Sequence, residues 1–414
     1  MRGRRLLGAL EERQFRRLYF ARAFSQLGDG LLPVALAFAV LDIDSSPSAL
    51  GFVLAARSVP LVAFLLVGGV WADRLERQRL MLASDLLRAA SQATVAVLVL
   101  TGRAELWHLI VLTFVYGLGA AFFLPASTGL IPQVVSPARL QQANALLSMT
   151  GSAFAVLGPA LAGVIIAVAA PGWAIAVDSA TFLVSAAFLA RLTLPAAVAR
   201  VPLGFLTELR DGWREFRSRT WLWVDGVFSA LGNALVLSPL WALGPVVAER
   251  ELAGASSWAT IVTAFGVGSV AGGVLAIRLR PRWPLRVAVA SLLTLALPPA
   301  MLAIPAETGV IAVASFAAGL GLIFFNTIFE TTVQQHVPAE SLSRVSSIDW
   351  VLSLGLQPIG FALAGPAAEA WGLSTALACA AVWGVVSTAV VLAVPSVWNL
   401  PRQEGHDVDP ARGT

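Results

Sequence analysis

The stretch Gly68–Arg79 reads GGVWADRLERQR and separates two long apolar runs. It begins with two glycines, and five of its last seven residues are charged. Charged turns between hydrophobic runs are typical of loops that join two transmembrane helices at one face of a membrane. The stretch therefore predicts a membrane protein whose chain crosses the bilayer on both sides of this loop.

The composition of the whole chain extends this prediction. Of its 414 residues, 57% are hydrophobic and 13% are charged, whereas soluble domains carry about 25% charged residues. Apolar runs of about 20 residues, the length that crosses a bilayer, recur between charged clusters. Because helices satisfy their own backbone hydrogen bonds in lipid, we expect an all-α polytopic fold with twelve spans, at about 18–41, 48–71, 80–101, 106–131, 140–169, 172–194, 221–247, 256–277, 285–304, 308–334, 342–368 and 372–395.

The distribution of arginine predicts how these spans are oriented. Nearly all arginines fall in the segments on one side of the predicted spans, and only Arg103 and Arg250 fall in segments on the other side. Basic residues favour cytoplasmic loops. We therefore expect a multi-pass protein of the cell (inner) membrane with both termini in the cytoplasm.

An internal repeat relates the two halves of the chain. A shift of 204 places Phe24–Asp29 on Phe228–Asn233, and a shift of 202 places Gly158–Gly163 on Gly360–Gly365. Such repeats are typical of transporters whose two halves enclose a site near the middle of the membrane. The predicted organisation is an N-terminal half, a cytoplasmic linker, a C-terminal half and a cytoplasmic tail, at residues 1–194, 195–220, 221–395 and 396–414.

The linker contains the longest polar stretch between two spans. Leu206, Leu209, Trp213 and Phe216 recur at helical spacing and are separated by charged residues. This pattern predicts an amphipathic helix suited to the headgroup layer of a membrane. A simple connection between the two halves explains the stretch without a regulatory role.

These residues resemble the major facilitator superfamily, and within it the bacterial branch of enterobactin exporters and macrolide efflux proteins. The resemblance covers the whole chain. Gly69–Arg79 is similar to the G-x-x-x-D-R loop signature of the superfamily, Gly158, Pro159 and Gly163 resemble its antiporter signature, and Ser25–Asp29 resembles the opening of this branch. The resemblance implies two six-helix halves that rock around a central substrate path, with first and seventh spans lining it.

Three loop residues receive a conformational role from the resemblance. Gly69, Asp73 and Arg74 match the loop signature, in which the aspartate holds the halves together near the start of the eleventh span. Arg74 has a counterpart in the repeat, Arg278, whereas Ile277 stands opposite Asp73. The orientation of the chain in the membrane therefore explains Arg74 by itself. Asp73 is expected to hold the two halves together at the cytoplasmic side.

The chain departs from the family at its fourth span. Thr113 occupies the position of an arginine that precedes the glycines Gly117 and Gly119 in the family's antiporters. Coupling to protons through that arginine is therefore not expected here, and Arg57 or Arg88 can take its place.

Ionisable side chains inside a membrane span are costly and are functional candidates by default. Asp29 lies near the middle of the first span, and its counterpart in the repeat is Asn233, so we expect the two to face each other across the substrate path. An aspartate at this depth can take up and release a proton. Arg57, at similar depth in the second span, is expected to pair with Asp29. A packing role for Asp29 and a permanent Asp29–Arg57 pair remain alternatives.

Further polar residues occupy the second half. Asn326 and Glu330, one turn apart in the tenth span, are candidates for substrate binding or an inner gate, although Glu330 can instead extend to the interface. Asp178, Asp225 and Asp349 are weaker candidates, because they lie near an interface or off the spans that line the path.

The fifth span is expected to act through its backbone. Gly158 and Gly163 permit close helix approach, and Pro159 removes a hydrogen-bond donor and bends the helix. A helix that is bendable and closely packed suits two rocking halves. Ordinary packing of small residues gives the same composition.

The favoured function is export of a small apolar or amphipathic compound, driven by the proton gradient, by a protein that is expected to be a monomer without a cofactor. An importer or lipid flippase on the same scaffold, and a membrane receptor without transport, remain alternatives. The sequence contains no nucleophile–base set, phosphate-binding loop or metal motif, so we expect neither an enzyme nor an ATP-driven pump. Its arginines are accounted for by membrane orientation, so no nucleic-acid partner is expected.

Overall fold

A computed structural model describes residues 8–74, 76–193, 205–279, 281–304 and 306–401, with side chains omitted at 65–74, 205–209, 211, 339, 340 and 343. The described residues are almost entirely helical and contain no strand. Twelve of the described helical segments are long and apolar enough to cross a membrane, as the sequence predicts.

The six spans of the N-terminal half are single helices. They are α2 (Arg13–Ile43), α3 (Pro47–Arg74), α4 (Arg77–Leu100), α5 (Leu106–Val134), α6 (Leu140–Val168) and α7 (Pro171–Ala190). Short 3-10 turns η1 (Gly8–Glu11) and η2 (Pro137–Arg139) precede α2 and α6.

Three spans of the C-terminal half are interrupted. The seventh is α9 (Thr220–Gly232), a π-helical turn η3 (Asn233–Leu237) and α10 (Ser238–Glu251); the ninth is α12 (Pro284–Ser291), η4 (Leu292–Ala296) and α13 (Leu297–Ala303); and the eleventh is α15 (Ala339–Gly355) and α16 (Gln357–Trp371). A proline follows each of the three breaks, as the second residue of α10, α13 and α16, and proline cannot donate a helical hydrogen bond. The continuous spans are α11 (Ala255–Arg278), α14 (Thr308–His336) and α17 (Leu373–Leu392), followed by the short α18 (Pro395–Trp398).

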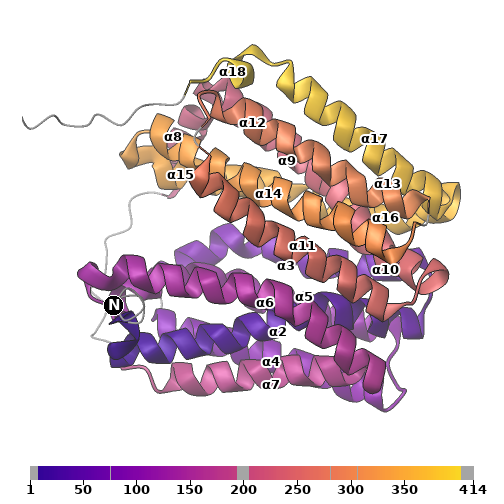
Figure 1. Ribbon diagram of the computed structural model, residues 1–414. Coiled ribbons are helices and arrows are strands. Elements are labelled where there is room, and N and C mark those ends of the chain that lie inside the picture. The colour runs from indigo at the N-terminus through magenta and orange to yellow at the C-terminus, as the bar shows by residue number, and fades with distance from the viewer. Residues whose placement is uncertain (1–7, 75, 194–204, 280, 305, 402–414) are drawn as a thin grey trace, which may run out of the picture.

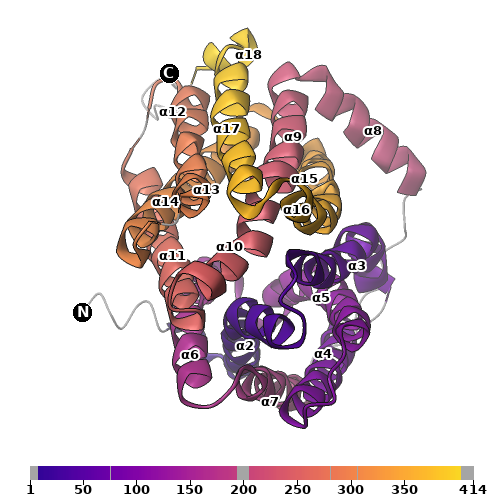
Figure 2. The ribbon, with the colours of Figure 1, turned by 90° about the vertical axis from the view of Figure 1, so that its right-hand side faces the viewer.

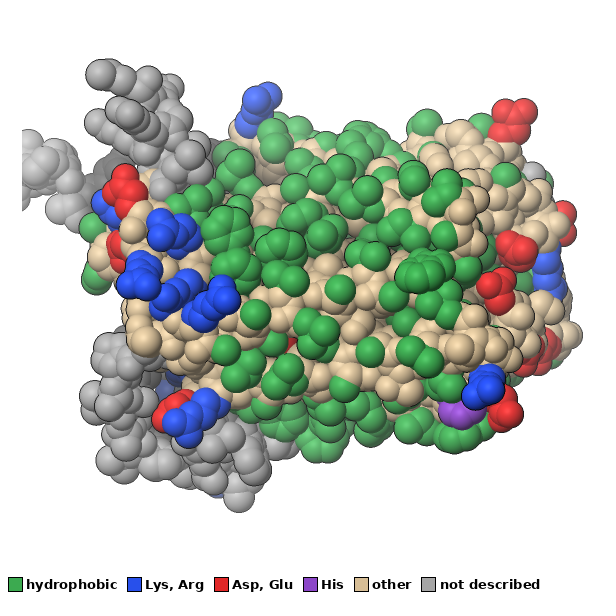
Figure 3. Space-filling view, turned by 90° about the horizontal axis from the view of Figure 1, so that it is seen from below, with side chains coloured by type: hydrophobic (Ala, Val, Ile, Leu, Met, Phe, Trp, Pro, Cys, Tyr) green, Lys and Arg blue, Asp and Glu red, His purple; other side chains and the backbone are tan. Residues whose placement is uncertain are grey.

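The surface has the pattern of a membrane protein. Large apolar side chains such as Val168, Val313 and Val382 are exposed along the spans. Figure 3 shows hydrophobic side chains across the middle of one face, with arginines mainly at one end and acidic side chains mainly at the other. We call the end where α2 begins and α17 ends the terminal end, and the opposite end the distal end. The arginine-rich end is the terminal end.

The spans form two bundles, α2–α7 and α9–α17 (Figure 1). The expected linker helix is present as α8 (Phe205–Ser218), which packs against α9 and α15 through the buried Phe216, whereas Trp213 is exposed. Residues 194–204 and 402–414, parts of the predicted linker and tail, lie outside the described residues, as do the side chains of Leu206 and Leu209.

The two bundles meet at the distal end. One hydrophobic core there combines residues of both halves, among them Leu36 and Leu50 with Leu243, Trp258 and Phe361. Figure 2 shows the two most extensive contacts between the bundles, α3 beside α16 and α6 beside α11. Toward the terminal end each half has a separate core of its own. The structure is therefore closed at the distal end.

Helix packing follows the sequence repeat. A Cβ atom added at Gly158 of α6 would lie 2.5 Å from the carbonyl carbon of Gly30 in α2. The repeat places these residues on Gly360 and Ala234, and a Cβ atom at Gly360 would overlap the Ala234 backbone. Both halves therefore need a glycine where their first and fifth spans cross.

This crossing gives a stability prediction. We expect Gly158→Ala to lower the free energy of unfolding by about 1–3 kcal/mol, the usual cost of overpacking, because backbone atoms of α2 must move. Thermal unfolding of the purified protein measures the effect. Gly273→Ala in α11 is the control, since its nearest neighbour would lie 3.7 Å away. Equal unfolding temperatures for both variants would contradict the packing assignment.

Candidate functional site

A cavity of about 370 Å³ lies between the two halves and contains the first candidate residue. Asp29 of α2, whose side chain is 39% exposed, lines this cavity with Gln26 and Pro159 of the same half. Trp241 and Phe265 contribute from the other half. Asp29 thus has access to a space that both halves enclose, as expected for a residue on a substrate path.

The partners of Asp29 differ from the prediction in one respect. Its Oδ1 accepts a hydrogen bond from the Tyr116 hydroxyl, and its Oδ2 lies 3.6 Å from Nη1 of Arg88. The predicted Asp29–Arg57 pair is wrong: the guanidinium of Arg57 lies over the Tyr116 ring, 5.1 Å from its centroid. Tyr116 thus contacts both Asp29 and Arg57.

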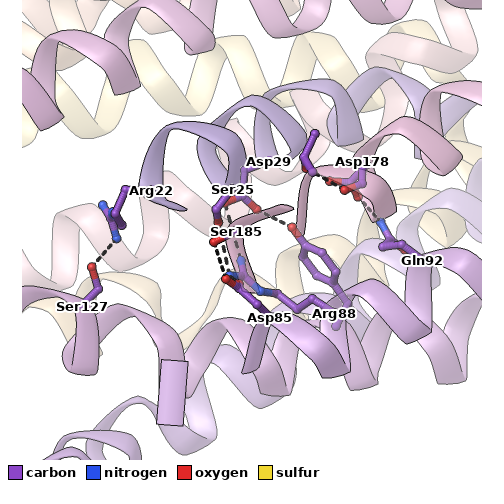
Figure 4. Close-up of polar contacts among 11 residues, drawn as sticks. Arg22, Ser25, Asp29, Asp85, Arg88, Gln92, Ser127, Asp178 and Ser185 are labelled. Carbon is purple, nitrogen blue, oxygen red and sulfur yellow. Dashed lines mark hydrogen bonds and ion pairs between the residues drawn. The ribbon is translucent and has the colours of Figure 1, made fainter. Parts of the chain in front are cut away.

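Arg88 of α4 is at the centre of the network in Figure 4. Its side chain is 2% exposed and forms ion pairs with both Asp29 and Asp85. It also donates a hydrogen bond of 3.3 Å to Ser25. Its guanidinium lies between the rings of Phe123 and Phe182, 4.3 and 4.2 Å from their centroids. This environment satisfies a cation that the membrane interior would otherwise disfavour.

Asp85 joins this network to a further helix. Its side chain is 0% exposed, and it accepts a hydrogen bond of 2.5 Å from Ser185 of α7. The network thus connects α2, α4, α5 and α7. Arg88 has two carboxylate partners of different exposure, since Asp29 faces the cavity and Asp85 is enclosed.

A helical stripe of polar residues in α4 was the sequence signal for this network. Its members follow the periodicity of a helix and are all buried: Ser84, Asp85, Arg88, Ser91 and Gln92. A polar stripe inside a membrane span predicts contacts with neighbouring helices rather than with lipid. From the sequence alone, Arg88 is expected only as a replacement for the family's arginine in the fourth span, and not as a member of this stripe.

Asp178 of α7, a weaker candidate, is buried within the N-terminal half and does not line the cavity around Asp29. Its Oδ2 accepts a hydrogen bond of 2.7 Å from Gln92, and its Oδ1 has no hydrogen-bond partner among the described residues. Gly28 leaves room for this side chain, since a Cβ atom there would overlap the Asp178 carboxylate. Arg22, nearer the terminal end of α2, donates a hydrogen bond of 2.6 Å to Ser127 (Figure 4).

The candidates of the C-terminal half line a second cavity of about 200 Å³. Asn233, Asn326 and Glu330 all contribute to it, together with Asp225 and Asp349. The expected confrontation of Asp29 with Asn233 is not found, because the two residues line different cavities. Asp225 and Asp349, the weaker candidates, thus line the same cavity as Asn233, Asn326 and Glu330.

Asn233 begins the π-helical turn of the seventh span. Its amide nitrogen donates to the carbonyl oxygens of Ser229, at 2.9 Å, and Ser353, at 3.1 Å. The second bond ties η3 to α15, and π-helical turns are frequent at functional sites.

The predicted conformational residues fall into two groups. Gly158 and Pro159 are buried in α6, and Gly163 of the same helix faces Ala259 of α11, where an added Cβ would lie 2.5 Å from the Ala259 Cβ. Gly163 thus lies at the contact between the halves. The side chains of the other group, Gly69, Asp73 and Arg74, lie outside the described residues.

Within the part of the chain that the structure describes, no group of three His, Cys, Asp or Glu side chains is placed to hold a metal ion. The chemistry that the two cavities offer is charge recognition and proton binding by carboxylates, beside aromatic and aliphatic walls.

Comparisons with known proteins agree with this architecture. The chain is 26% identical over 411 residues to the multidrug efflux pump Tap of Mycobacterium tuberculosis, which covers 95% of this chain and 96% of Tap. It is 23% identical over 376 residues to macrolide efflux protein A of Streptococcus pyogenes, covering 87% and 91% of the two chains.

Solved structures share the fold. The nucleoside transporter NupG superposes with a TM-score of 0.71 at 14% identity, covering 94% of this chain and 100% of NupG. A bacterial homolog of the human lysosomal transporter Spinster, in an inward-facing and unoccupied conformation, gives a TM-score of 0.71 at 17% identity and covers 91% and 95% of the two chains. The family described as transmembrane secretion effector matches residues 6–412. The chain therefore belongs to the transmembrane secretion effector family, within the major facilitator superfamily of transporters.

Proposed function

We propose that this transporter exports a small apolar or amphipathic compound in exchange for protons, by alternating access. The observation that carries the proposal is the cavity around Asp29 between two halves that share a core only at the distal end. Separate cores toward the terminal end allow the halves to part there without breaking either bundle. Rocking about the central cavity then exchanges which end is closed.

Orientation follows from charge. The terminal end carries most of the arginines, and basic residues favour the cytoplasmic side. With the terminal end in the cytoplasm, the structure is closed to the outside. In this orientation, the protein takes its substrate from the cytoplasm or the inner leaflet of the cell membrane. We propose that it does so as a monomer.

The shared arginine supplies a mechanism for coupling to protons. When Asp29 takes up a proton from the cavity, its ion pair with Arg88 weakens, but Asp85 still neutralises Arg88. Arg88 is therefore never left as an unpaired buried charge, which would be costly. Asp29, the more exposed of the two carboxylates, is the proton site in this mechanism.

Export rather than import is supported by the relatives, two of which are named as efflux proteins. The apolar and aromatic residues around Asp29, such as Trp241 and Phe265, suit a partly hydrophobic compound. In this proposal, the proton gradient alone drives export.

A transport assay tests the proposal. In proteoliposomes with an acidic lumen, we expect the wild-type protein to accumulate ethidium or erythromycin, because protons leaving the lumen drive uptake. Asp29→Asn is expected to reduce this uptake to that of liposomes without protein. Asp42→Asn, at the exposed distal end of the same helix, is the control.

Gradient-driven uptake by Asp29→Asn at the wild-type rate would contradict the role of Asp29. Uptake by the wild type that ignores the pH gradient would contradict proton exchange itself.

A further inference from the structure

The cavity of the C-terminal half is strongly acidic. Three carboxylates, Asp225 of α9, Glu330 of α14 and Asp349 of α15, line it, and none of the described residues lining it is basic. When these carboxylates are ionised, they give the cavity a negative potential. The cavity around Asp29 differs, because Arg88 lies beside its one carboxylate.

These carboxylates lack cationic partners in the described part of the chain. Asp225 is 5% exposed, and among the described residues its carboxylate accepts one hydrogen bond, of 3.4 Å, from Ser229. The buried Oδ1 of Asp349 has no hydrogen-bond partner among the described residues. Enclosed carboxylates without partners are costly. They favour either protonation or a cation that comes from outside the chain.

The walls of the cavity favour an organic cation over a metal ion. Phe228, Phe325, Phe329 and Trp350 line it, and the rings of Phe325 and Phe329 stack with centroids 5.5 Å apart. Aromatic faces attract ammonium groups, whereas hard metal ions need several oxygen ligands. No group of three candidate ligands is close enough for a metal among the described residues.

The repeat shows that the fold does not require these acids. The positions equivalent to Asp225, Glu330 and Asp349 in the N-terminal half are Ala21, Thr128 and Leu147. Helices of the same architecture therefore pack without a carboxylate at any of the three positions. A role in structure alone does not account for them.

We propose that the cavity formed by Asp225, Glu330 and Asp349 with the surrounding aromatic rings binds the cationic end of an amphipathic substrate. The inference rests on the proposed export function and narrows its substrate class to compounds with an ammonium group. A cavity of about 200 Å³ accommodates a substituted ammonium group with a short apolar arm, while larger apolar parts of the substrate remain outside it.

Binding to the purified full-length protein in lipid nanodiscs tests the inference. The probes are 4-phenylbutyltrimethylammonium and its neutral isostere, which has carbon in place of nitrogen. Isothermal titration calorimetry is expected to show a preference for the cation. Asp225→Asn and Asp349→Asn are each expected to weaken cation binding about 30-fold or more, the usual effect of removing one partner of a buried charge pair, without changing binding of the isostere.

Two further variants keep the test decisive. Glu330 is exposed, so Glu330→Gln is expected to fold even where a buried variant does not, and to weaken cation binding in the same direction. Glu307→Gln changes an exposed acid at the start of α14, away from the cavity, and should bind the cation like the wild type.

Equal affinity for the cation and its isostere would overturn the inference. Unchanged cation affinity in the Asn and Gln variants would also overturn it and would leave proton binding as the role of these carboxylates. The binding assay uses no pH gradient. A negative result would therefore reject cation binding by this cavity without rejecting proton-driven export, which the transport assay tests separately.

Discussion

Arg88→Met is expected to lower the free energy of unfolding by about 3–5 kcal/mol, the usual cost of removing one partner of a buried ion pair. The variant leaves Asp85, which is 0% exposed, without a cation in the middle of the N-terminal half. It also removes the side chain that fills the space between Phe123 and Phe182. Thermal unfolding of the purified protein measures the loss.

A double variant separates charge from packing. Arg88→Met combined with Asp85→Asn removes both members of the enclosed pair, and replacing a whole buried ion pair is often neutral for stability. We expect it to recover most of the lost stability but not gradient-driven transport, since Asp29 still lacks its arginine. A change below about 1 kcal/mol in Arg88→Met, as for exposed ion pairs, would contradict the central position of Arg88.

Gly365→Ala is expected to open the distal end. Gly365 of α16 lies against the backbone of Ser48 in α3, and an added Cβ would overlap Ser48. Overpacking costs about 1–3 kcal/mol. A free-energy change of this size alters the ratio of the state that is open at the distal end to the state that is closed there about 5- to 150-fold. Because the clash exists only while the halves meet, the population shifts toward the state that is open at the distal end.

Spin labels across the distal end measure this shift. In a Cys379→Ser background, Ser45→Cys and Glu251→Cys place labels on the two halves, near the hydrogen bond of 2.9 Å from Arg250 to the Ser45 carbonyl. Gly365→Ala should increase the population with the longer distance. Gly355→Ala is the control, because nothing lies within 4 Å of its added Cβ. An identical distance distribution in both variants would refute the role of this contact.

The twelve spans and the two-half architecture could be predicted from the sequence because both follow from local patterns. Apolar runs interrupted by charged turns, such as Gly68–Arg79, mark the spans. The repeat relates Gly158 to Gly360, and in the structure both glycines permit a close approach of the backbone of another helix. Close helix contact limits which residues fit at such a crossing, so the two halves have the same residue there.

The pairing inside the N-terminal half could not be predicted in the same way. Counting residues gives the depth of a side chain in the membrane but not the rotation of its helix. Asp29 and Arg57 lie at similar depth, yet Tyr116 lies beside both, and Asp29 pairs with Arg88 instead. The buried polar stripe of α4 was the available signal, since its period fixes which face is turned inward.

The acidic cavity was missed for a related reason. Asp225 and Asp349 are far apart in sequence and become neighbours of one cavity only through the packing of α9 on α15. Each lies on a different span, so the pattern within one span does not reveal the pair. Their apolar counterparts Ala21 and Leu147 were a signal that the repeat offered, because they show where the two halves diverge in polarity.

Proton movement driven by the substrate tests the account most directly. Proteoliposomes with trapped pyranine and an inwardly directed ethidium gradient report lumenal pH while the probe enters. Coupling between two gradients is reciprocal, so we predict that ethidium entry makes the lumen more alkaline with the wild-type protein and leaves lumenal pH unchanged with Asp29→Asn. Ethidium transport by the wild-type protein without any change in lumenal pH would contradict the account.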